Sequence, residues 1–147
     1  MRIQAYEDAD EGEVVALWRD CGLLVPHNDP VADIAFCLAS GHGEVFVGRE
    51  EDSVVAALMV GHDGHRGWLY YLAVDPGRRH AGLAREITAH AERWLAGLGV
   101  RKVQLMIRDT NTAVRDFYAA IGYAEEPRVI MARWLVDKDA QVKGGNG

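Results

Sequence analysis

The stretch YYLAVDPGRRHAGLA, residues 70–84, joins an apolar strand to the first turn of a helix. Residues 68–74 are rich in aromatic and branched side chains, which is typical of a strand. The small residues Gly82 and Ala84 follow at the start of the helix, where they let a ligand approach the backbone closely. The first amides of a helix lack partners within it and carry a positive partial charge. This corner therefore predicts a phosphate-binding site, to which the pair Arg78-Arg79 adds charge.

The glycines of this corner match neither of two common nucleotide-binding motifs. No Gly-Lys-Ser/Thr follows the turn, as a P-loop requires. The glycine spacing also differs from the dinucleotide fingerprint, and no further parallel βαβ unit follows. A crowded strand-to-helix corner with two solvated arginines is an alternative interpretation, and the stretch by itself fits both equally well.

The residues before the corner predict two helices and a meander of strands. A strand over residues 2–6 precedes a helix that Asp8 or Asp10 can cap. Asp29 as the N-cap and Pro30 at the first helical position begin a second, short helix. Three consecutive strands follow and favour antiparallel pairing, over residues 44–49, 53–62 and 68–74.

The residues after the corner predict two more helices and two more strands. An amphipathic helix begins near Leu83 and ends at the glycines around residue 98. A strand over residues 102–107 leads to a helix that residues 109–111 can cap, and a final strand covers residues 128–135. The order β, α, α, β, β, β, α, β, α, β predicts an α+β (mixed α/β) domain.

Length and composition predict one folded domain. The chain has 147 residues, of which 49% are hydrophobic and 26% charged, as in ordinary globular domains. We expect the domain to cover residues 1–137. The remaining tail, residues 138–147, has almost nothing apolar to bury, and we expect it to be disordered.

The net charge and the cysteines limit which partners the protein is expected to bind and in which cellular compartment it is expected to lie. A formal net charge of -6 disfavours nucleic acid and anionic membrane surfaces as partners. No apolar run is long enough to predict a membrane span, and residues 1–20 do not resemble a signal peptide. Cys21 and Cys37 fit no zinc pattern, and we expect both to stay reduced in a cytoplasmic protein.

Two motifs, in order, resemble the signatures of the Gcn5-related N-acetyltransferase (GNAT) superfamily. The first is Val74-Asp75-Pro76 followed by Arg79-His80-Ala81-Gly82-Leu83-Ala84. The second is Asn111 followed by Phe117-Tyr118-Ala119-Ala120-Ile121-Gly122-Tyr123. The segments 61–67 and 26–29 are similar to those of the bacterial YpeA-like subgroup. The resemblance extends from the first strand to Leu135, and it implies a mostly antiparallel sheet with one splayed parallel strand pair, flanked by about four helices.

The resemblance also implies a cosubstrate and the residues that hold it. Acetyl-CoA would lie between the two splayed strands, and an amine would attack its thioester directly, with no metal ion. The backbone of Leu72, Ala73 and Val74 would pair with the pantetheine arm. The pyrophosphate would lie on the amides of Arg79, His80, Ala81, Gly82, Leu83 and Ala84. Asn111 would contact the cosubstrate, and Tyr118 would protonate the departing thiolate.

Tyr118 has a second interpretation that rests on spacing alone. It shares a helix face with Val114, Phe117 and Ile121, and an aromatic residue at helical spacing usually packs in the core. A phenol can still hydrogen-bond and steady a leaving sulfur. The resemblance favours the acid role.

Two positions depart from the family pattern. Met106, five residues before Asn111, stands where relatives that acetylate ribosomal-protein N-termini have a glutamate base, so that role is disfavoured. We expect its side chain to form an apolar strand wall, where an inserted carboxylate would be partly buried and costly. His80-Ala81 replaces a glycine and a basic residue, which keeps the backbone donors but removes one charge.

The acceptor and any general base stay open. Candidate bases are Glu44, His62, Asp63 and His65, although Asp63-Gly64 reads most simply as a turn. The loop over residues 26–29 can offer His27, Asn28 and Asp29 to a cationic acceptor. Trp68 and Trp134 lie on expected strands, and either could line the acceptor site or a homodimer contact.

We therefore expect an N-acetyltransferase acting on a primary amine of a small molecule or peptide. A sensor that binds acetyl-CoA without turnover is one alternative, and a binding module that only shares the fold is another. Binding of acetyl-CoA separates the last interpretation from the first two.

Overall fold

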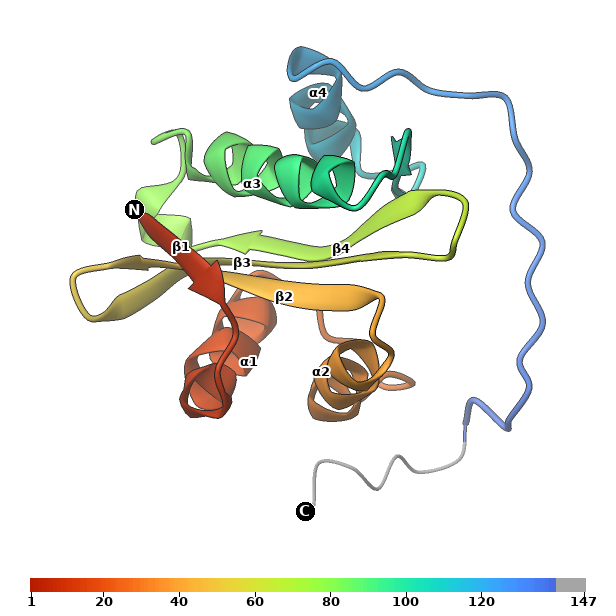
Figure 1. Cartoon of the computed structure of the whole chain (residues 1–147). Coiled ribbons are helices and arrows are strands. Elements are labelled where there is room, and N and C mark those ends of the chain that lie inside the picture. Colours follow the sequence, from red (N-terminus) through yellow and green to blue (C-terminus); the bar gives the residue numbers. More distant parts are fainter. Residues whose placement is uncertain (140–147) are drawn as a thin grey trace.

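A central sheet with two helices on each face forms the body of the protein (Figure 1). This computed structural model describes residues 1–139, so residues 140–147 of the tail expected to be disordered lie outside the described residues. The elements are β1 (Arg2–Ala5), a 3-10 turn (Asp8–Asp10), α1 (Glu11–Asp20), α2 (Pro30–Ala39), β2 (Gly43–Glu50), β3 (Ser53–His62), β4 (Gly67–Val74), a second 3-10 turn (Pro76–Arg78), α3 (Leu83–Gly97), β5 (Val103–Gln104) and α4 (Thr112–Ala120). The sheet order is β1-β2-β3-β4-β5, and only the β4–β5 pair is parallel. The α+β class with a mostly antiparallel sheet is thus confirmed.

Side-chain caps set where two of the helices begin. The Asp29 side chain accepts hydrogen bonds from the amides of Val31 and Ala32, and Pro30 follows it, as expected. Asn111 caps α4 by accepting from the Val114 amide. At α1 the aspartates expected as caps instead form a short 3-10 turn, so the helix proper begins at Glu11.

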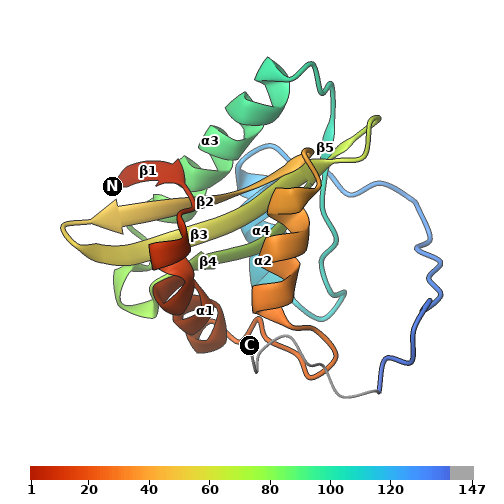
Figure 2. The same cartoon turned by 60° about the horizontal axis from the view of Figure 1, so that its bottom comes forward.

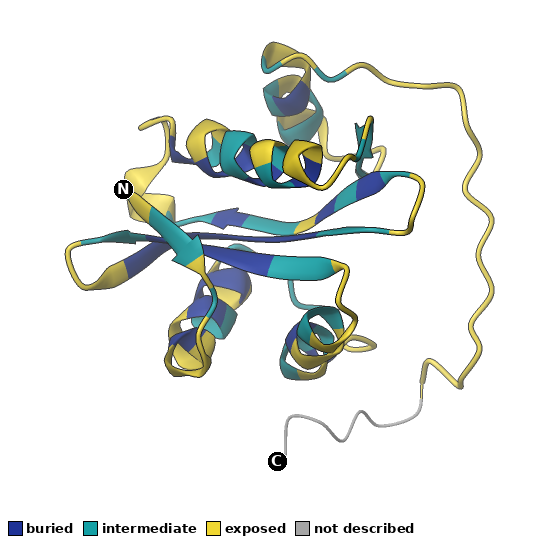
Figure 3. Cartoon of the chain, in the orientation of Figure 1, coloured by how far each residue is buried: buried dark blue, intermediate teal, exposed yellow. Residues whose placement is uncertain are grey.

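The sheet separates two apolar clusters, seen as the dark-blue inner surfaces in Figure 3. On one face α1 and α2 pack on the sheet through Val14, Trp18 and Ile34. On the other face α3 and α4 pack through Ile87, Leu95 and Tyr118. β3 is buried from Val54 to Val60 because it lies at the centre of the sheet between the two helix layers.

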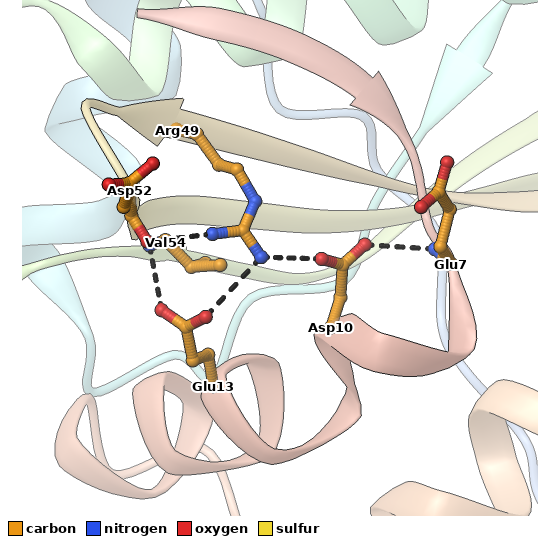
Figure 4. A network of polar contacts seen from close by, with 6 residues as sticks. All are labelled: Glu7, Asp10, Glu13, Arg49, Asp52 and Val54. Carbon is orange, nitrogen blue, oxygen red and sulfur yellow. Dashed lines mark hydrogen bonds and ion pairs between the residues drawn. The ribbon is translucent and has the colours of Figure 1, made fainter.

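A polar network fastens the start of α1 to the hairpin between β2 and β3 (Figure 4). The Arg49 guanidinium donates to the carboxylates of Asp10 and Glu13, and the side chain of Asp10 is only 4% exposed. Glu13 also accepts from the Val54 amide at 3.0 Å. Asp10 completes the network by accepting from the Glu7 amide, so each buried oxygen of its carboxylate has a donor.

The two expected strands after α3 differ most from the structure. The strand expected over residues 102–107 is only Val103–Gln104. The strand expected over residues 128–135 is not formed: residues 124–139 have no ladder partner and stand apart from the sheet (Figures 1 and 2). A strand exists only where another backbone pairs with it, and these residues pair with no strand of the sheet. None of the described helices is long and apolar enough to cross a membrane.

Candidate functional site

A wedge opens between the parallel strands β4 and β5. The two strands pair only at Gly67 with Val103 and at Trp68 with Gln104. β4 continues to Val74 and stays paired with β3 on its other side. Residues 69–74 of β4 therefore have no ladder partner toward β5 among the described residues. Their backbone groups on that side are available to a ligand with amides of its own.

A bulge marks the middle of β4 at the wedge. Tyr71 has a left-handed backbone (φ 56), and the pairing register with β3 shifts at this point. Its ring stacks on Trp18 at 4.2 Å, and its hydroxyl donates to Asp33 Oδ2 at 2.7 Å. Burial and the nearby carboxylate of Asp33 raise the pKa of Tyr71 above its ordinary value. These contacts hold α1 and α2 against the strand that carries the wedge.

A pocket of about 220 Å³ lies at the end of β4, where the chain turns into α3. Its lining is Val74, Arg78, Arg79, His80, Gly82, Leu83, Ala84, Arg85 and Phe117. Of the ten residues expected to bind the cosubstrate, six line this pocket. Leu72 and Ala73 lie on β4 outside the pocket, Ala81 is exposed in the turn beside it, and Asn111 is at the start of α4.

The backbone of the turn is shaped to start the helix at this pocket. His80 and Gly82 both have left-handed backbones, with φ of 70 and 78. A Cβ added to Gly82 would meet nothing within 4 Å, so the conformation rather than the space requires glycine there. His80 takes the same conformation at a steric cost that glycine would avoid. The amides of the first turn of α3 have no helical acceptors and border the pocket.

The cations around the pocket are not equivalent. Arg78 pairs with Glu50 at 2.8 Å and lies 3.7 Å from Asp75, so its charge is already matched. Arg79 and Arg85 form no ion pair with any described residue. Both arginines expected to add charge line the pocket, and they differ in that Arg78 is paired with Glu50 whereas Arg79 has no ion pair with a described residue. Arg85 and Phe117 were not expected in the pocket, although the helical spacing from Gly82 to Arg85 could have indicated the arginine.

Tyr118 is buried and belongs to the core face of α4. Only 5% of the residue is exposed, and its ring lies edge-on to Phe117 and to Tyr123. Burial, reinforced by the negative charge of Glu92, raises its pKa well above the ordinary value. Its hydroxyl has no hydrogen-bond partner among the described residues, whereas the Tyr123 hydroxyl donates to Glu92 at 2.7 Å. The phenol of Tyr118 thus stays protonated with an unused donor.

The side chain of Asn111 caps α4 with its oxygen and keeps its NH2 group available. Its Oδ1 accepts from the Val114 amide at 3.3 Å, which caps α4. Its side-chain NH2 group remains a donor, and the residue is exposed. The cap therefore fixes the side chain without using the group that would face a ligand.

Three of the four candidate bases have contacts that distinguish them, whereas the fourth, His65, is exposed in the turn between β3 and β4. Asp63 accepts from the amides of His65 and Arg66 and from Trp68 Nε1, which lowers its pKa to about 2. It is a turn residue with little capacity to take a proton at neutral pH. The ring of His62 lies beside His42 at 5.4 Å, while Glu44 accepts from the adjacent Val45 amide.

An acidic pair lies beside the bulge on the α2 side. Asp29 is 8% exposed, and its Oδ2 has no partner among the described residues although its Oδ1 caps α2. Asp33, one turn along α2, accepts a hydrogen bond from the Tyr71 hydroxyl. The two carboxylates place negative charge next to the strand that carries the wedge.

Met106 does not form the buried strand wall that the sequence suggested. It is 50% exposed and follows the end of β5. A carboxylate at this position would remain in contact with water, so the expected cost of burying it is corrected to a small one.

The sequence is similar to a known protein family and to several bacterial proteins. A family model described as the acetyltransferase (GNAT) family matches residues 7–123. An acetyltransferase of Yersinia enterocolitica is 34% identical over 136 residues, which cover 92% of this chain and 96% of the relative. An acetyltransferase of Sodalis glossinidius is 37% identical over 131 residues, covering 89% and 92%.

Solved structures share the fold at lower identity. An aminoglycoside 6'-N-acetyltransferase from Acinetobacter haemolyticus has a TM-score of 0.78 at 17% identity, with 93% of this chain and 100% of that chain covered. The aminoglycoside acetyltransferase AAC(6')-Iy, bound to a bisubstrate analogue of CoA and acetylneamine, has a TM-score of 0.78 at 20% identity, with 92% and 98% covered.

Proposed function

Because the chain belongs to the GNAT acetyltransferase family, we propose that it transfers the acetyl group of acetyl-CoA to a primary amine of a small molecule or peptide. The observation that carries the proposal is the continuity of the β4–β5 wedge with the arginine-lined pocket at the start of α3. A wedge with free backbone groups fits an amide-containing arm. A helix N-terminus with unpaired cations fits a pyrophosphate.

Different residues are proposed to bind different parts of acetyl-CoA. Leu72, Ala73 and Val74 offer backbone groups on the open side of β4. The first amides of α3 and the unpaired guanidinium groups of Arg79 and Arg85 take the phosphate charge. The NH2 group of Asn111 adds a side-chain donor from α4. Acetyl-CoA supplies an activated thioester. The protein binds and orients it, and the amine is the nucleophile.

Tyr118 is the proposed acid. The amine nitrogen forms a bond to the acyl carbon, the carbon–sulfur bond breaks, and the thiolate sulfur needs a proton or a donor. Its hydroxyl is protonated at physiological pH and can donate a hydrogen bond to that sulfur, which steadies the thiolate, while the raised pKa disfavours complete transfer of the proton. The acetylated nitrogen loses its proton to water, and we assign no protein base.

The acidic pair supports a cationic acceptor. The unpartnered Oδ2 of Asp29 and the carboxylate of Asp33 favour an amine that carries a further positive charge. The substitution Asp29→Asn tests this, because asparagine keeps the N-cap of α2 and removes only the charge. We expect a several-fold rise in KM for diamines and little change for neutral monoamines. An equal rise for both classes would refute the charge argument.

Two measurements test the function as a whole. Calorimetry with acetyl-CoA tests the wedge and the pocket, and no binding at millimolar concentration would refute the proposal. A screen that follows thiol release over amines, amino acids and N-terminal peptides then tests turnover. Binding without turnover on any acceptor would favour the sensor, an alternative suggested by the core packing of Tyr118 and the capping role of Asn111.

A further inference from the structure

Two aromatic side chains of β4, Trp68 and Tyr70, lie outside both apolar clusters of the body. Tyr70 is 42% exposed, and Trp68 is partly exposed. Among the described residues, neither ring packs against either cluster, and neither stacks on another aromatic ring or lies edge-on to one. Large aromatic side chains usually bury most of their area, so an uncovered pair on a central strand indicates a binding surface.

Both rings are on the face of the sheet that α1 and α2 cover elsewhere. Tyr70 pairs with Met59, which belongs to the cluster beneath α1 and α2, whereas the neighbouring Leu69 belongs to the cluster on the opposite face. Trp68 shares the face of Tyr70, because residues two apart on a strand share a face. The bulge adds Tyr71 to the same face. The two helices therefore cover Tyr71 and leave the two rings before it open.

The two rings lie at the closed end of the wedge. The last ladder pair between β4 and β5 joins Trp68 to Gln104, so the wedge opens from this point. The pocket proposed for the pyrophosphate lies at the other end of β4, beside Val74. A cosubstrate whose arm follows β4 from that pocket brings its thioester toward Tyr70. An acceptor that lies on the two rings is then close to the acyl carbon.

A fixed carboxylate beside the rings gives this surface a negative charge. Asp63 Oδ2 accepts from Trp68 Nε1 at 3.1 Å, and Oδ1 accepts from the amides of His65 and Arg66 at 2.9 and 2.7 Å. These bonds hold the indole ring in place and keep the carboxylate ionised at neutral pH. Burial and the charge of Asp63 raise the pKa of Tyr70, so its phenol stays neutral. No cationic side chain pairs with Asp63 among residues 1–139.

The chemistry of this surface favours a cation. Electron-rich ring faces next to an unpaired carboxylate attract positive charge, and they offer a neutral or anionic group much less. Two side chains on one face of a strand are about 7 Å apart at their Cα atoms, so a small cationic group fits against both rings. The nitrogen that attacks the thioester must be uncharged, because a protonated amine has no free electron pair. The group on the rings is therefore a second, separate group of the acceptor.

We propose that Trp68 and Tyr70 bind a cationic head group of the acceptor and so determine acceptor specificity, with Asp63 as the residue that positions the indole. The inference rests on the proposed transferase function and narrows its substrate class. The acceptor carries a quaternary ammonium or guanidinium group a few bonds away from the amine that is acetylated. The hydrogen bond from Tyr71 to Asp33 places a further carboxylate on the same face, which adds to the attraction for that charge.

Choline and its neutral isostere test this surface without any turnover. The isostere has a tert-butyl group in place of trimethylammonium, so the two probes share a shape and differ in charge. Calorimetry in the presence of CoA should show choline binding at least about fivefold more tightly than the isostere. Tyr70→Leu should reduce that preference below about twofold, whereas Tyr70→Phe keeps the ring and should retain it. Phe36→Leu is the matched control, because Phe36 is 83% exposed on α2 and is not part of the surface.

Three results of the binding experiment would overturn the proposal. They are equal affinity for the two probes, an unchanged preference in Tyr70→Leu, and no binding of choline at tens of millimolar. Trp68→Leu is a second variant with the same expected loss of preference. An acetyl-CoA affinity within about twofold of the unmodified protein shows that each variant is folded, since both substitutions leave the backbone of the wedge intact.

Turnover separates this inference from the function on which it rests. In the amine analogues of the two probes an amino group replaces the hydroxyl. The ratio of their kcat/KM values, cationic over neutral, should fall at least about fivefold in Tyr70→Leu. Comparing the ratio between proteins cancels the different pKa values of the two amines. Turnover with the same ratio in both proteins would refute the specificity and leave the transferase standing. A preference for choline without thiol release from any amine would refute the transferase and leave the cation surface standing.

Discussion

Replacing Arg79 and Arg78 separately by alanine tests which cation of the pocket binds the phosphates. Both side chains line the pocket, but Arg78 already pairs with Glu50 at 2.8 Å and Arg79 has no ion pair with a described residue. A hydrogen bond to a charged group contributes about 1.5–3 kcal/mol. Because Arg79 is exposed, water screens its charge, and we take the lower end.

That lower end corresponds to about a tenfold weaker binding of acetyl-CoA for Arg79→Ala. For Arg78→Ala we expect a change below about threefold, because its loss removes a charge that Glu50 already balances. Calorimetric titration at low and at high salt is the measurement. The difference between the two variants should shrink as salt rises, since exposed charges are screened.

The outcome that would refute the reasoning is an affinity loss for Arg78→Ala as large as that for Arg79→Ala. It would show that the ion pair with Glu50 opens when the cosubstrate binds. An unchanged affinity for both variants would show that neither arginine of this corner binds the phosphates. Replacing Gly82 by valine would be a weaker test, because the left-handed backbone of Gly82 would strain any other residue with or without a ligand.

The other predictions concern catalysis, stability and the acceptor. Tyr118→Phe removes only a hydroxyl, so turnover should fall by roughly 10²–10⁴ while acetyl-CoA affinity changes less than about twofold; full turnover in steady-state assays would leave Tyr118 as packing alone. Because burial raises the pKa of Tyr118 above its ordinary value near ~10, the kcat profile should show no decline from its ionisation between pH 6 and about 10; a decline that Tyr118→Phe abolishes would contradict this. Arg49→Ala leaves the nearly buried carboxylate of Asp10 without its cation, so urea unfolding should show a loss of about 2–4 kcal/mol, with Arg49→Lys in between; equal stability of the three proteins would show that the network in Figure 4 is dispensable. Met106→Glu should fold normally, because the position is half exposed, and should give no rate gain on peptides beginning with Ala or Ser; a clear gain would show that N-terminal peptides are the acceptors.

The local features of this protein were predictable because they depend on residues close together in the chain. The N-caps at Asp29 and Asn111 follow from a side-chain oxygen and amides two or three residues later. The left-handed turn at Gly82 follows from a residue without a Cβ before an amphipathic run. The pocket at this corner is built from such features, and so its position could be expected from residues 70–84.

The features that were missed depend on partners distant in the sequence. Only the structure shows that Glu50 neutralises Arg78, because that contact joins residues 28 positions apart. The bulge at Tyr71 depends on its register with β3 and on the ring of Trp18. Neither contact can be predicted from the residues that neighbour Arg78 or Tyr71 in the sequence.

The final strand shows the limit most clearly. Residues 128–135 are rich in branched and other apolar side chains, and the sequence determined that they are able to form a strand. Whether they do depends on a backbone edge to pair with, because strand hydrogen bonds join separate segments whereas helix hydrogen bonds join residues four apart. Only the tertiary structure showed that this segment has no ladder partner among the described residues.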